Sequence, residues 1–391
     1  MGIILTQLFE VFVKVAGFNF TALKIAKAET LLAAHPPLGA AIAKLTRLGN
    51  LELSFAGERC AELLRTLQSK LVMATFSFGD VDGEQDDEDI PEGDRNPILL
   101  LHGSQATLQC LDTSFSVSSL NGPRYPNMVD LTLSYMDLPM IEDYIRAFPN
   151  LRALSAVDCS GPYGIGTEVW EERRMSSIGY QARHGTWQSL QYYCGSVLIL
   201  WIFGLACRIH SVELDFEDDE LDLAKFDDVL RAVRPTCLAL RLPEASCIMD
   251  EDFRSALCRC KDSLKVVDLH VSFNSRKDAT LFVGDILDSL ADVIRTSSAT
   301  SLALCLDWSW AAGERMDSSE ELPPMPFEVY LQEMNVDGYA DTLLASVASL
   351  QELHVSLVGP RRCSREAERK RTRDDSRNAS GGSSGNAEDW T

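Results

Sequence analysis

The sequence predicts an α/β fold in which short strands alternate with helices along most of the chain. Two patterns lead to this prediction. A spacing Leu-x-x-Leu-x-Leu returns many times, and stripes of apolar residues at helical spacing lie between its copies. Hydrophobic residues make up 46% of the 391 residues, so the chain has enough apolar side chains to build a sizeable core.

The repeated spacing fits a short strand whose last two apolar residues point into the core, while the residue between them faces outward. The clear copies, each given by its three apolar positions, are Leu48, Leu51, Leu53; Met128, Leu131, Leu133; Leu151, Leu154, Ala156; Val197, Leu200, Ile202; Ile209, Val212, Leu214; Leu264, Val267, Leu269; and Leu350, Leu353, Val355. Weaker copies lie near Leu108, Leu238 and Leu302.

Helices are expected between these strands, because apolar residues recur there three and four positions apart. The stripes are Cys60, Leu63, Leu64, Leu67; Ile141, Tyr144, Ile145, Phe148; Phe226, Val229, Leu230, Val233; Phe253, Ala256, Leu257; and Phe282, Ile286, Leu290, Val293, Ile294. Two of them end just before a proline, Pro149 or Pro235, which is a common helix boundary.

A strand-plus-helix unit cannot bury its apolar face alone, so stacked units share one continuous core. We therefore predict a leucine-rich-repeat-like solenoid with irregular repeats over residues 36–358, in which helices lie on the convex side of a curved parallel sheet. The repeat length drifts from about 23 to about 35 residues, against a typical range of about 20 to 29. A globular βαβ domain with a parallel sheet is therefore the alternative.

The first 35 residues are predicted to form an N-terminal helical segment. Leu5, Leu8, Phe12 and Val15 recur at helical spacing, whereas charged residues interrupt the run too often for a membrane span. The beginning of the chain also fits the short myristoylation pattern, which matches many sequences by chance.

Three other segments lack a repeating apolar pattern. Residues 79–94 are strongly acidic and are expected to form a solvated loop, and residues 160–185 are expected to form a surface loop with a short helix. The tail, residues 359–391, is basic and then rich in Gly and Ser, which predicts disorder. Its cluster Arg369–Arg373 is either a nuclear-localisation signal or part of a solvated tail.

Charge and cysteine usage limit the function classes. The net charge of −22 argues against nucleic acid or an anionic membrane as a main partner. Most of the 11 cysteines, Cys110, Cys237 and Cys305 among them, sit in apolar runs, with irregular spacing and no CxxC. This usage is typical of reduced thiols in a core, and it predicts a reducing compartment, the cytoplasm or the nucleus. We also expect the chain to be a monomer. No metal-ligand grouping, catalytic motif or cofactor motif is present, so we predict no metal, catalytic or cofactor site.

The strand register predicts which side chains form a partner-binding concave face. Acidic side chains dominate these outward positions, which suggests a surface for a basic segment of another protein, with a tryptophan as apolar anchor. The alternative is that they are simply solvated strand residues. The predicted surface consists of Glu52, Asp112, Asp130, Trp201, Glu213, Asp215, Asp268, His270 and His354.

Several segments resemble the F-box/leucine-rich-repeat-like proteins that are numerous in mushroom-forming fungi. They are Pro36-Pro37-Leu38 through Leu53, Trp187 through Leu205, and Arg234-Pro235 through Leu240, and the resemblance spans most of residues 36–358. It implies a substrate receptor, in which an F-box docks on a cullin-type ubiquitin ligase and the repeats select the target. The first 45 residues contain no Leu-Pro-x-Glu stretch of the kind that opens an F-box.

Three function classes follow. The first is a non-enzymatic protein-binding repeat protein that serves as substrate-recognition subunit of an SCF-type ubiquitin ligase. The second is a repeat scaffold or regulatory protein with no ligase link. The third is an α/β enzyme, which a deep pocket with convergent polar groups would support.

Overall fold

The computed structural model describes residues 7, 20–78, 91–136, 140–157, 167–188, 190–215, 222–273, 278, 280–309, 324–360 and 364–371. The chain divides into two compact units, Met1–Glu213 and Leu214–Thr391. The boundary between them falls within strand β8 (Ser211–Asp215).

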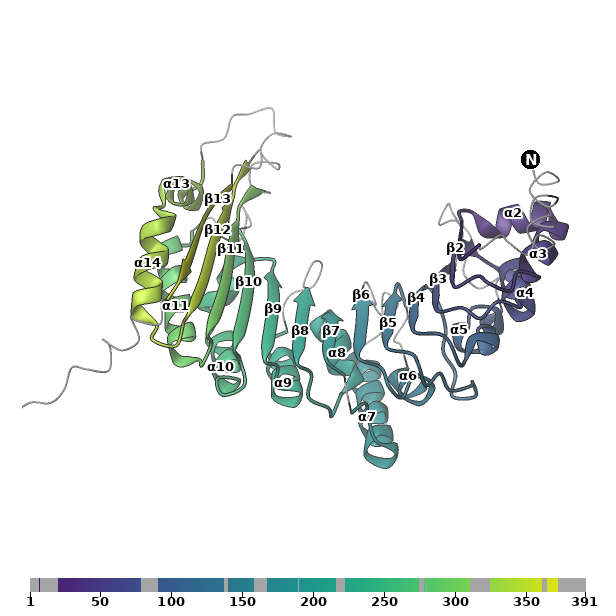
Figure 1. Ribbon diagram of the computed structural model, residues 1–391. Coiled ribbons are helices and arrows are strands. Elements are labelled where there is room, and N and C mark those ends of the chain that lie inside the picture. Colours follow the sequence, from purple (N-terminus) through teal and green to yellow (C-terminus); the bar gives the residue numbers. More distant parts are fainter. Residues whose placement is uncertain are drawn as a thin grey trace, which may run out of the picture. The chain divides into compact units, whose positions relative to one another are not determined.

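The first unit alternates strands with helices (Figure 1). Its strands before β8 are β1 (Ala22–Ile25), β2 (Asn50–Ala56), β3 (Met73–Phe78), β4 (Cys110–Ser114), β5 (Asp130–Ser134), β6 (Ala153–Val157) and β7 (Tyr192–Gly195). Its helices are α2 (Ala28–Ala34), α3 (Pro36–Ala43), α4 (Glu58–Thr66), α5 (Pro97–Leu100), α6 (Ile141–Ala147), α7 (Thr167–His184) and α8 (Val197–Phe203), with short 3-10 helices at Glu92–Asp94 and His102–Ser104.

The second unit has the same alternation and ends in a hairpin-like pair of strands. Its strands after β8 are β9 (Cys237–Leu242), β10 (Val266–Ser272), β11 (Ser301–Asp307), β12 (Glu352–Val358) and β13 (Ser364–Lys370). Its helices are α9 (Leu223–Val233), α10 (Glu251–Arg259), α11 (Val283–Thr296), α13 (Pro326–Glu333) and α14 (Val336–Ser346), with a 3-10 helix at Ala245–Met249.

Within each unit the strands pair in sequence order. Neighbouring strands from β1 to β7, and from β9 to β12, are parallel, whereas β13 pairs with β12 in the antiparallel direction. A parallel pair needs a crossover between its strands, and the helices supply most of these crossovers. The predicted α/β class with a mostly parallel sheet is therefore confirmed.

The cores lie between the strands and the helices. In β5, Leu131 and Leu133 are fully buried, while Asp130, Thr132 and Ser134 alternate with them and stay accessible. Figure 1 shows the helices of each unit on one side of its strands. We call the opposite side the open face of that unit. The five predicted helical stripes coincide with α4, α6, α9, α10 and α11, although Leu67 and Phe148 directly follow α4 and α6 and Phe282 directly precedes α11.

One predicted strand is a helix. The run from Val197 to Phe203 forms α8, and Trp201 is buried within it at 8% exposure. The reason is local capping, because the Ser196 side chain accepts a hydrogen bond from the Ile199 N–H, and Gly204 ends the helix at φ 51°. The strand in this region is β7, which ends directly before the serine.

Two further predictions are corrected at the termini. Residues Ala22–Ile25, predicted as helical, form strand β1, which pairs with β2. Residues Ser364–Lys370, predicted as disordered, form β13, because they pair with β12 and Ala367 is buried. The predicted N-terminal helix at residues 8–19 and the tail at residues 372–391 lie outside the described residues.

The two insertions are also more ordered than predicted where they are described. Helix α7 covers Thr167–His184, so the second insertion contains a long helix in place of a short one. Glu92–Asp94 of the acidic segment form a 3-10 helix, and Asp94 forms an ion pair with Arg65. Residues 79–90 and 158–166 lie outside the described residues.

Candidate functional site

The open face of the first unit carries four of the nine predicted binding residues. Strand pairing aligns one outward residue from each strand in a row: Lys24, Glu52, Thr75, Asp112, Thr132, Ser155 and Cys194. Asp130 pairs with Cys110 in the adjacent outward row, and Glu213 accepts a hydrogen bond of 2.8 Å from the Tyr192 hydroxyl. The structure therefore places Glu52, Asp112, Asp130 and Glu213 on one face of one unit.

The described part of this face carries more carboxylates than cations. The outward positions of β2 to β7 contain no lysine or arginine, and Lys24 on β1 forms a 2.5 Å ion pair with Glu52. Partial burial raises the pKa of Asp112, and the charges of Glu52 and Asp130 raise it further. Partial burial also raises the pKa of Asp130. A raised carboxylate pKa means that burial and nearby negative charges destabilise the anionic form. A cation brought by a partner would therefore stabilise that form.

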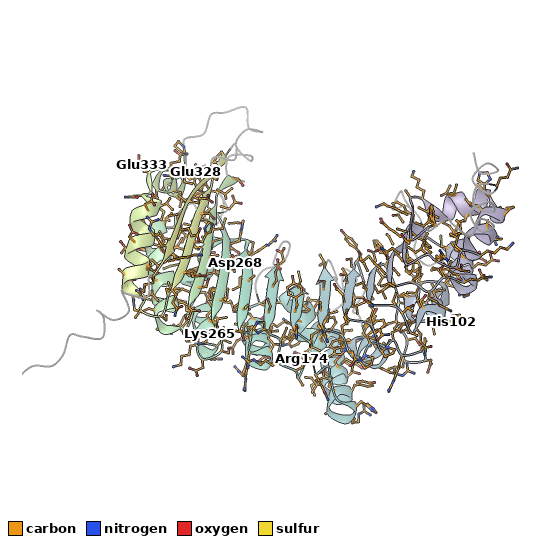
Figure 2. All side chains as sticks on the ribbon, in the orientation of Figure 1. His102, Arg174, Lys265, Asp268, Glu328 and Glu333 are labelled. Carbon is orange, nitrogen blue, oxygen red and sulfur yellow. The ribbon has the colours of Figure 1, made fainter. Side chains whose placement is uncertain are left out.

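The open face of the second unit is more evenly charged. Asp215 lies 3.6 Å from Arg241, and His270 lies 3.4 Å from Asp307. Asp268 lies on β10 between the small residues Ala239 and Ala303 of the neighbouring strands (Figure 2). His354 pairs in register with Glu368 of β13. The charge of Asp215 is therefore offset by Arg241, and that of Asp307 by His270.

The pair of His270 and Asp307 should make the stability of the second unit depend on pH. Hydrogen bonds to Asp307 and to Cys305 raise the pKa of His270 from 6.5 to about 10, against the opposing effect of burial. The bond from His270 helps lower the pKa of Asp307, although burial acts in the opposite direction. A raised histidine pKa gives stability that is complete below pH 6.5 and is lost as the pH rises to about 10.

We expect His270→Gln to remove this pH dependence. The free energy of unfolding of the wild type, relative to the variant, should fall between pH 6.5 and pH 10. The effect should be modest, because 37% of the histidine side chain is exposed and water screens the pair. Urea unfolding at several pH values measures it, with His354→Gln as the control for loss of a histidine. Parallel pH profiles of the wild type and His270→Gln would contradict the prediction.

Trp201 does not belong to either open face. The Arg174 guanidinium lies 4.7 Å from the centre of its ring, and the same side chain donates a hydrogen bond to the Trp201 carbonyl. Figure 2 marks Arg174, which comes from α7. The predicted apolar anchor is therefore a packing residue between α7 and α8, and its role as an anchor for a partner is wrong.

Sequence reasoning missed an aromatic feature at the ends of three strands. Phe55, Phe115 and Tyr135 each follow a serine at the end of β2, β4 and β5, and each has a positive φ of 56°, 54° and 50°, respectively. The Phe115 and Tyr135 rings stack at 5.2 Å with an angle of 10° between their planes. The signal in the sequence was the recurrence of Ser-Phe or Ser-Tyr immediately after the outward strand positions.

Cysteines also occupy outward positions, contrary to expectation. Cys110, Cys237 and Cys305 alternate with buried leucines and are partly exposed, whereas Cys60 and Cys260 are buried in the cores. None of the cysteines in the described ranges forms a disulfide. A leucine-rich run therefore did not distinguish inward from outward thiols, because only strand register separates the two faces.

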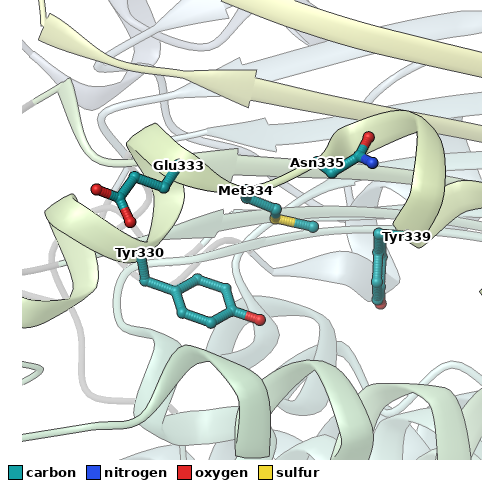
Figure 3. A pocket seen from close by; sticks show the side chains of 5 residues that line it. All are labelled: Tyr330, Glu333, Met334, Asn335 and Tyr339. Carbon is teal, nitrogen blue, oxygen red and sulfur yellow. The ribbon is translucent and has the colours of Figure 1, made fainter.

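A pocket of about 330 Å³ lies at the junction of α13 and α14 (Figure 3). Its lining residues are Tyr330, Glu333, Met334, Asn335 and Tyr339. The Tyr339 hydroxyl is buried without a hydrogen-bond partner, and burial raises the pKa of this tyrosine. The residues that line the pocket do not combine a nucleophile with a general base, so the pocket gives little support to the interpretation as an enzyme.

Within the described ranges, no group of three His, Cys, Asp or Glu side chains is arranged to hold a metal ion. No described helix has the length and apolar character needed to cross a bilayer. No protein-family model matches the chain, and no curated protein is significantly similar to it.

Proposed function

We propose that the chain is a non-enzymatic protein of the leucine-rich-repeat type, whose first unit binds a basic segment of a partner protein on its open face. The observation that carries the proposal is the set of outward carboxylates Glu52, Asp112, Asp130 and Glu213, on a face without lysine or arginine between β2 and β7. Electrostatic complementarity of this kind selects partners and speeds their association.

The shape of the surface supports the same proposal. Between the carboxylates, the aligned row carries the small polar residues Thr75, Thr132 and Ser155. Such side chains leave room for a partner's main chain and can donate or accept hydrogen bonds. The repeated Leu-x-Leu strands with helices on one side support the repeat-type fold, in which sheet faces commonly serve as binding surfaces.

Removing two carboxylates tests the proposal. We expect Asp112→Asn with Asp130→Asn to weaken the binding of a lysine- and arginine-rich peptide about 5- to 30-fold, from about 0.5–1 kcal/mol per partly exposed pair. The affinity is measured by fluorescence anisotropy at two salt concentrations, since screening should reduce the difference. A peptide of the same length with glutamate in place of the basic residues should not bind.

The matched control changes the same charge elsewhere in the first unit. Glu171→Gln with Glu172→Gln removes two exposed carboxylates from α7. If both double variants weaken peptide binding equally, the peptide responds only to net charge, and the open face is not the binding surface.

The ubiquitin-ligase role is a finer form of the proposal, and it rests on the resemblance to F-box/leucine-rich-repeat-like proteins. In that form the open face selects the substrate, and a separate segment docks on the ligase adaptor. Affinity purification of the tagged chain tests it. Co-purification of adaptor and cullin subunits supports a substrate receptor, whereas recovery of other partners without them supports a scaffold with no ligase link.

A further inference from the structure

The aromatic feature at the ends of β2, β4 and β5 is built at a cost in backbone energy. Phe55, Phe115 and Tyr135 all adopt the left-handed region, which bulky residues rarely occupy because it is strained for a residue with a Cβ. The residue that directly follows each aromatic residue is buried in the core; these residues are Ala56, Ser116 and Met136. The left-handed residue therefore lets the chain re-enter the core one position later than simple alternation would.

A comparison within the same sheet shows what the left-handed residue changes. In β3, Phe76, Ser77 and Phe78 follow ordinary alternation, and Phe78 is buried at 1% exposure. In β2, the register with β3 shifts between Leu53 and Ala56, so Phe55 is the extra residue of a bulge. The aromatic residue after the serine thus lies in the core in β3, whereas in β2 it lies outside the regular pairing.

The edge of β4, β5 and β6 presents exposed apolar surface. The Phe115 N–H donates to the Ser134 carbonyl at 3.1 Å, and the Tyr135 N–H donates to the Val157 carbonyl at 3.3 Å, so these bonds hold the strand ends together. Tyr135 is 52% exposed and Val157 is 39% exposed. We call Phe115, Tyr135 and Val157 the aromatic edge. A stacked aromatic pair left this accessible is typical of a binding surface.

The aromatic edge follows the same strands that carry Asp112 and Asp130. Asp112 precedes Phe115 by three positions on β4, which corresponds to about 10 Å along a strand. Asp130 begins β5, and Tyr135 directly follows that strand, five positions further along the chain. A side chain that meets both features needs a positive charge for the carboxylate and a flat surface for the rings. The arginine guanidinium has both properties, whereas the lysine ammonium is a strongly hydrated point charge.

We propose that the aromatic edge is an arginine-selective part of the binding surface, at which Phe115 and Tyr135 stack with guanidinium groups of a partner segment that Asp112 attracts. This inference rests on the proposed function, and it adds the chemistry of the partner: an extended segment in which arginine cannot be replaced by lysine.

The test compares two synthetic peptides of identical sequence and charge, one with three arginines and one with three lysines. We expect the full chain to bind the arginine peptide about 5- to 10-fold more tightly in a fluorescence anisotropy titration. Phe115→Gly with Tyr135→Gly should bring the two affinities together. Glycine adopts a positive φ readily, so this variant should keep its fold and melt no earlier than the wild type.

The matched control removes an exposed aromatic ring elsewhere. Phe282 is 75% exposed and precedes α11 as its N-cap residue, a position where glycine is tolerated. Phe282→Gly should keep the preference for arginine. Equal affinities of the wild type for the two peptides, or a preference that survives in the Phe115 and Tyr135 variant, would overturn the inference. If Asp112→Asn with Asp130→Asn still weakens binding in that case, the proposed function stands without it.

Discussion

A Gly195→Ala protein is expected to unfold with a free energy about 2–5 kcal/mol lower than that of the wild type. Gly195 ends β7 at φ 150°, a conformation that residues with a Cβ rarely adopt. A Cβ at this position would lie 2.2 Å from the carbonyl oxygen of Ala156 on β6 and 2.8 Å from the Tyr193 hydroxyl. Because the first of these atoms is backbone, the strands must separate to accept the methyl group.

The damage should extend beyond one pair of residues. Gly195 pairs with Ala156 in the parallel register, and the next residue, Ser196, caps α8. A displaced strand end would therefore weaken both the β6–β7 pairing and the start of the following helix. Denaturant unfolding followed by circular dichroism measures the change.

Gly179→Ala is the control for this substitution. Gly179 lies within α7, and a Cβ there meets no atom within 4 Å. Alanine should stabilise the helix by roughly 0.5–1 kcal/mol, because glycine is more costly inside a helix. A Gly195→Ala protein as stable as the wild type would show that β6 and β7 do not approach as closely as described.

A chain that ends before Ser364 is expected to lose about 3–5 kcal/mol of stability in its second unit, at roughly 1 kcal/mol for each lost hydrogen bond. Strand β13 pairs with β12 from Glu352 to Val358. Its arginines also reach the helices: Arg365 donates to the carbonyls of Met334 and Leu331, and Arg371 donates to those of Ala348 and Leu344. These carbonyls would be left without those partners.

The exposed ion pairs of β13 should contribute much less to this loss. Arg369 contacts Asp337 at 2.7 Å and Asp341 at 2.6 Å, but both carboxylates are largely exposed. Exposed pairs of this kind add little to stability, because water screens the two charges. We therefore expect Arg369→Gln to have a small effect, in contrast to removal of the whole strand.

A chain that ends after Arg371 is the control, because it keeps every contact of β13 described above. The chain that ends before Ser364 should also aggregate, because the loss of β13 exposes the hydrogen-bonding edge of β12. Thermal unfolding and light scattering measure the two effects. Equal stability of the two shortened chains would contradict a structural role for β13.

Most strands were predictable because their information is local. Leu131 and Leu133, or Val267 and Leu269, lie two positions apart and point to the same face, which is the geometry of any strand with one buried side. The same spacing predicted outward positions for Glu52, Asp112, Glu213 and Asp268, and the strand register bears out each of them. Strand β3 was not predicted, because alanine and phenylalanine, and not leucine, occupy its inward positions.

Other features depend on contacts between segments far apart in the sequence. β13 consists mainly of charged residues that alone indicate disorder, and it becomes a strand only because the edge of β12 accepts its hydrogen bonds. Local capping explains the missed helix at Trp201, since an apolar run suits a buried strand and a buried helix equally. The positive φ of Phe115 and Tyr135 likewise requires neighbouring strands that hold the chain in place.

The amino-acid pattern thus determines the α/β class, the direction in which strand residues alternate and the acidic character of the outward positions. Each of these follows from the side-chain period of a strand or a helix and needs no knowledge of its neighbours. Tertiary contacts settle which carboxylates lack a cation, since Asp307 has His270 beside it while Asp112 has Glu52 and Asp130. They also stack Phe115 on Tyr135, because strand register, and not sequence distance, sets which side chains of β4 and β5 are neighbours.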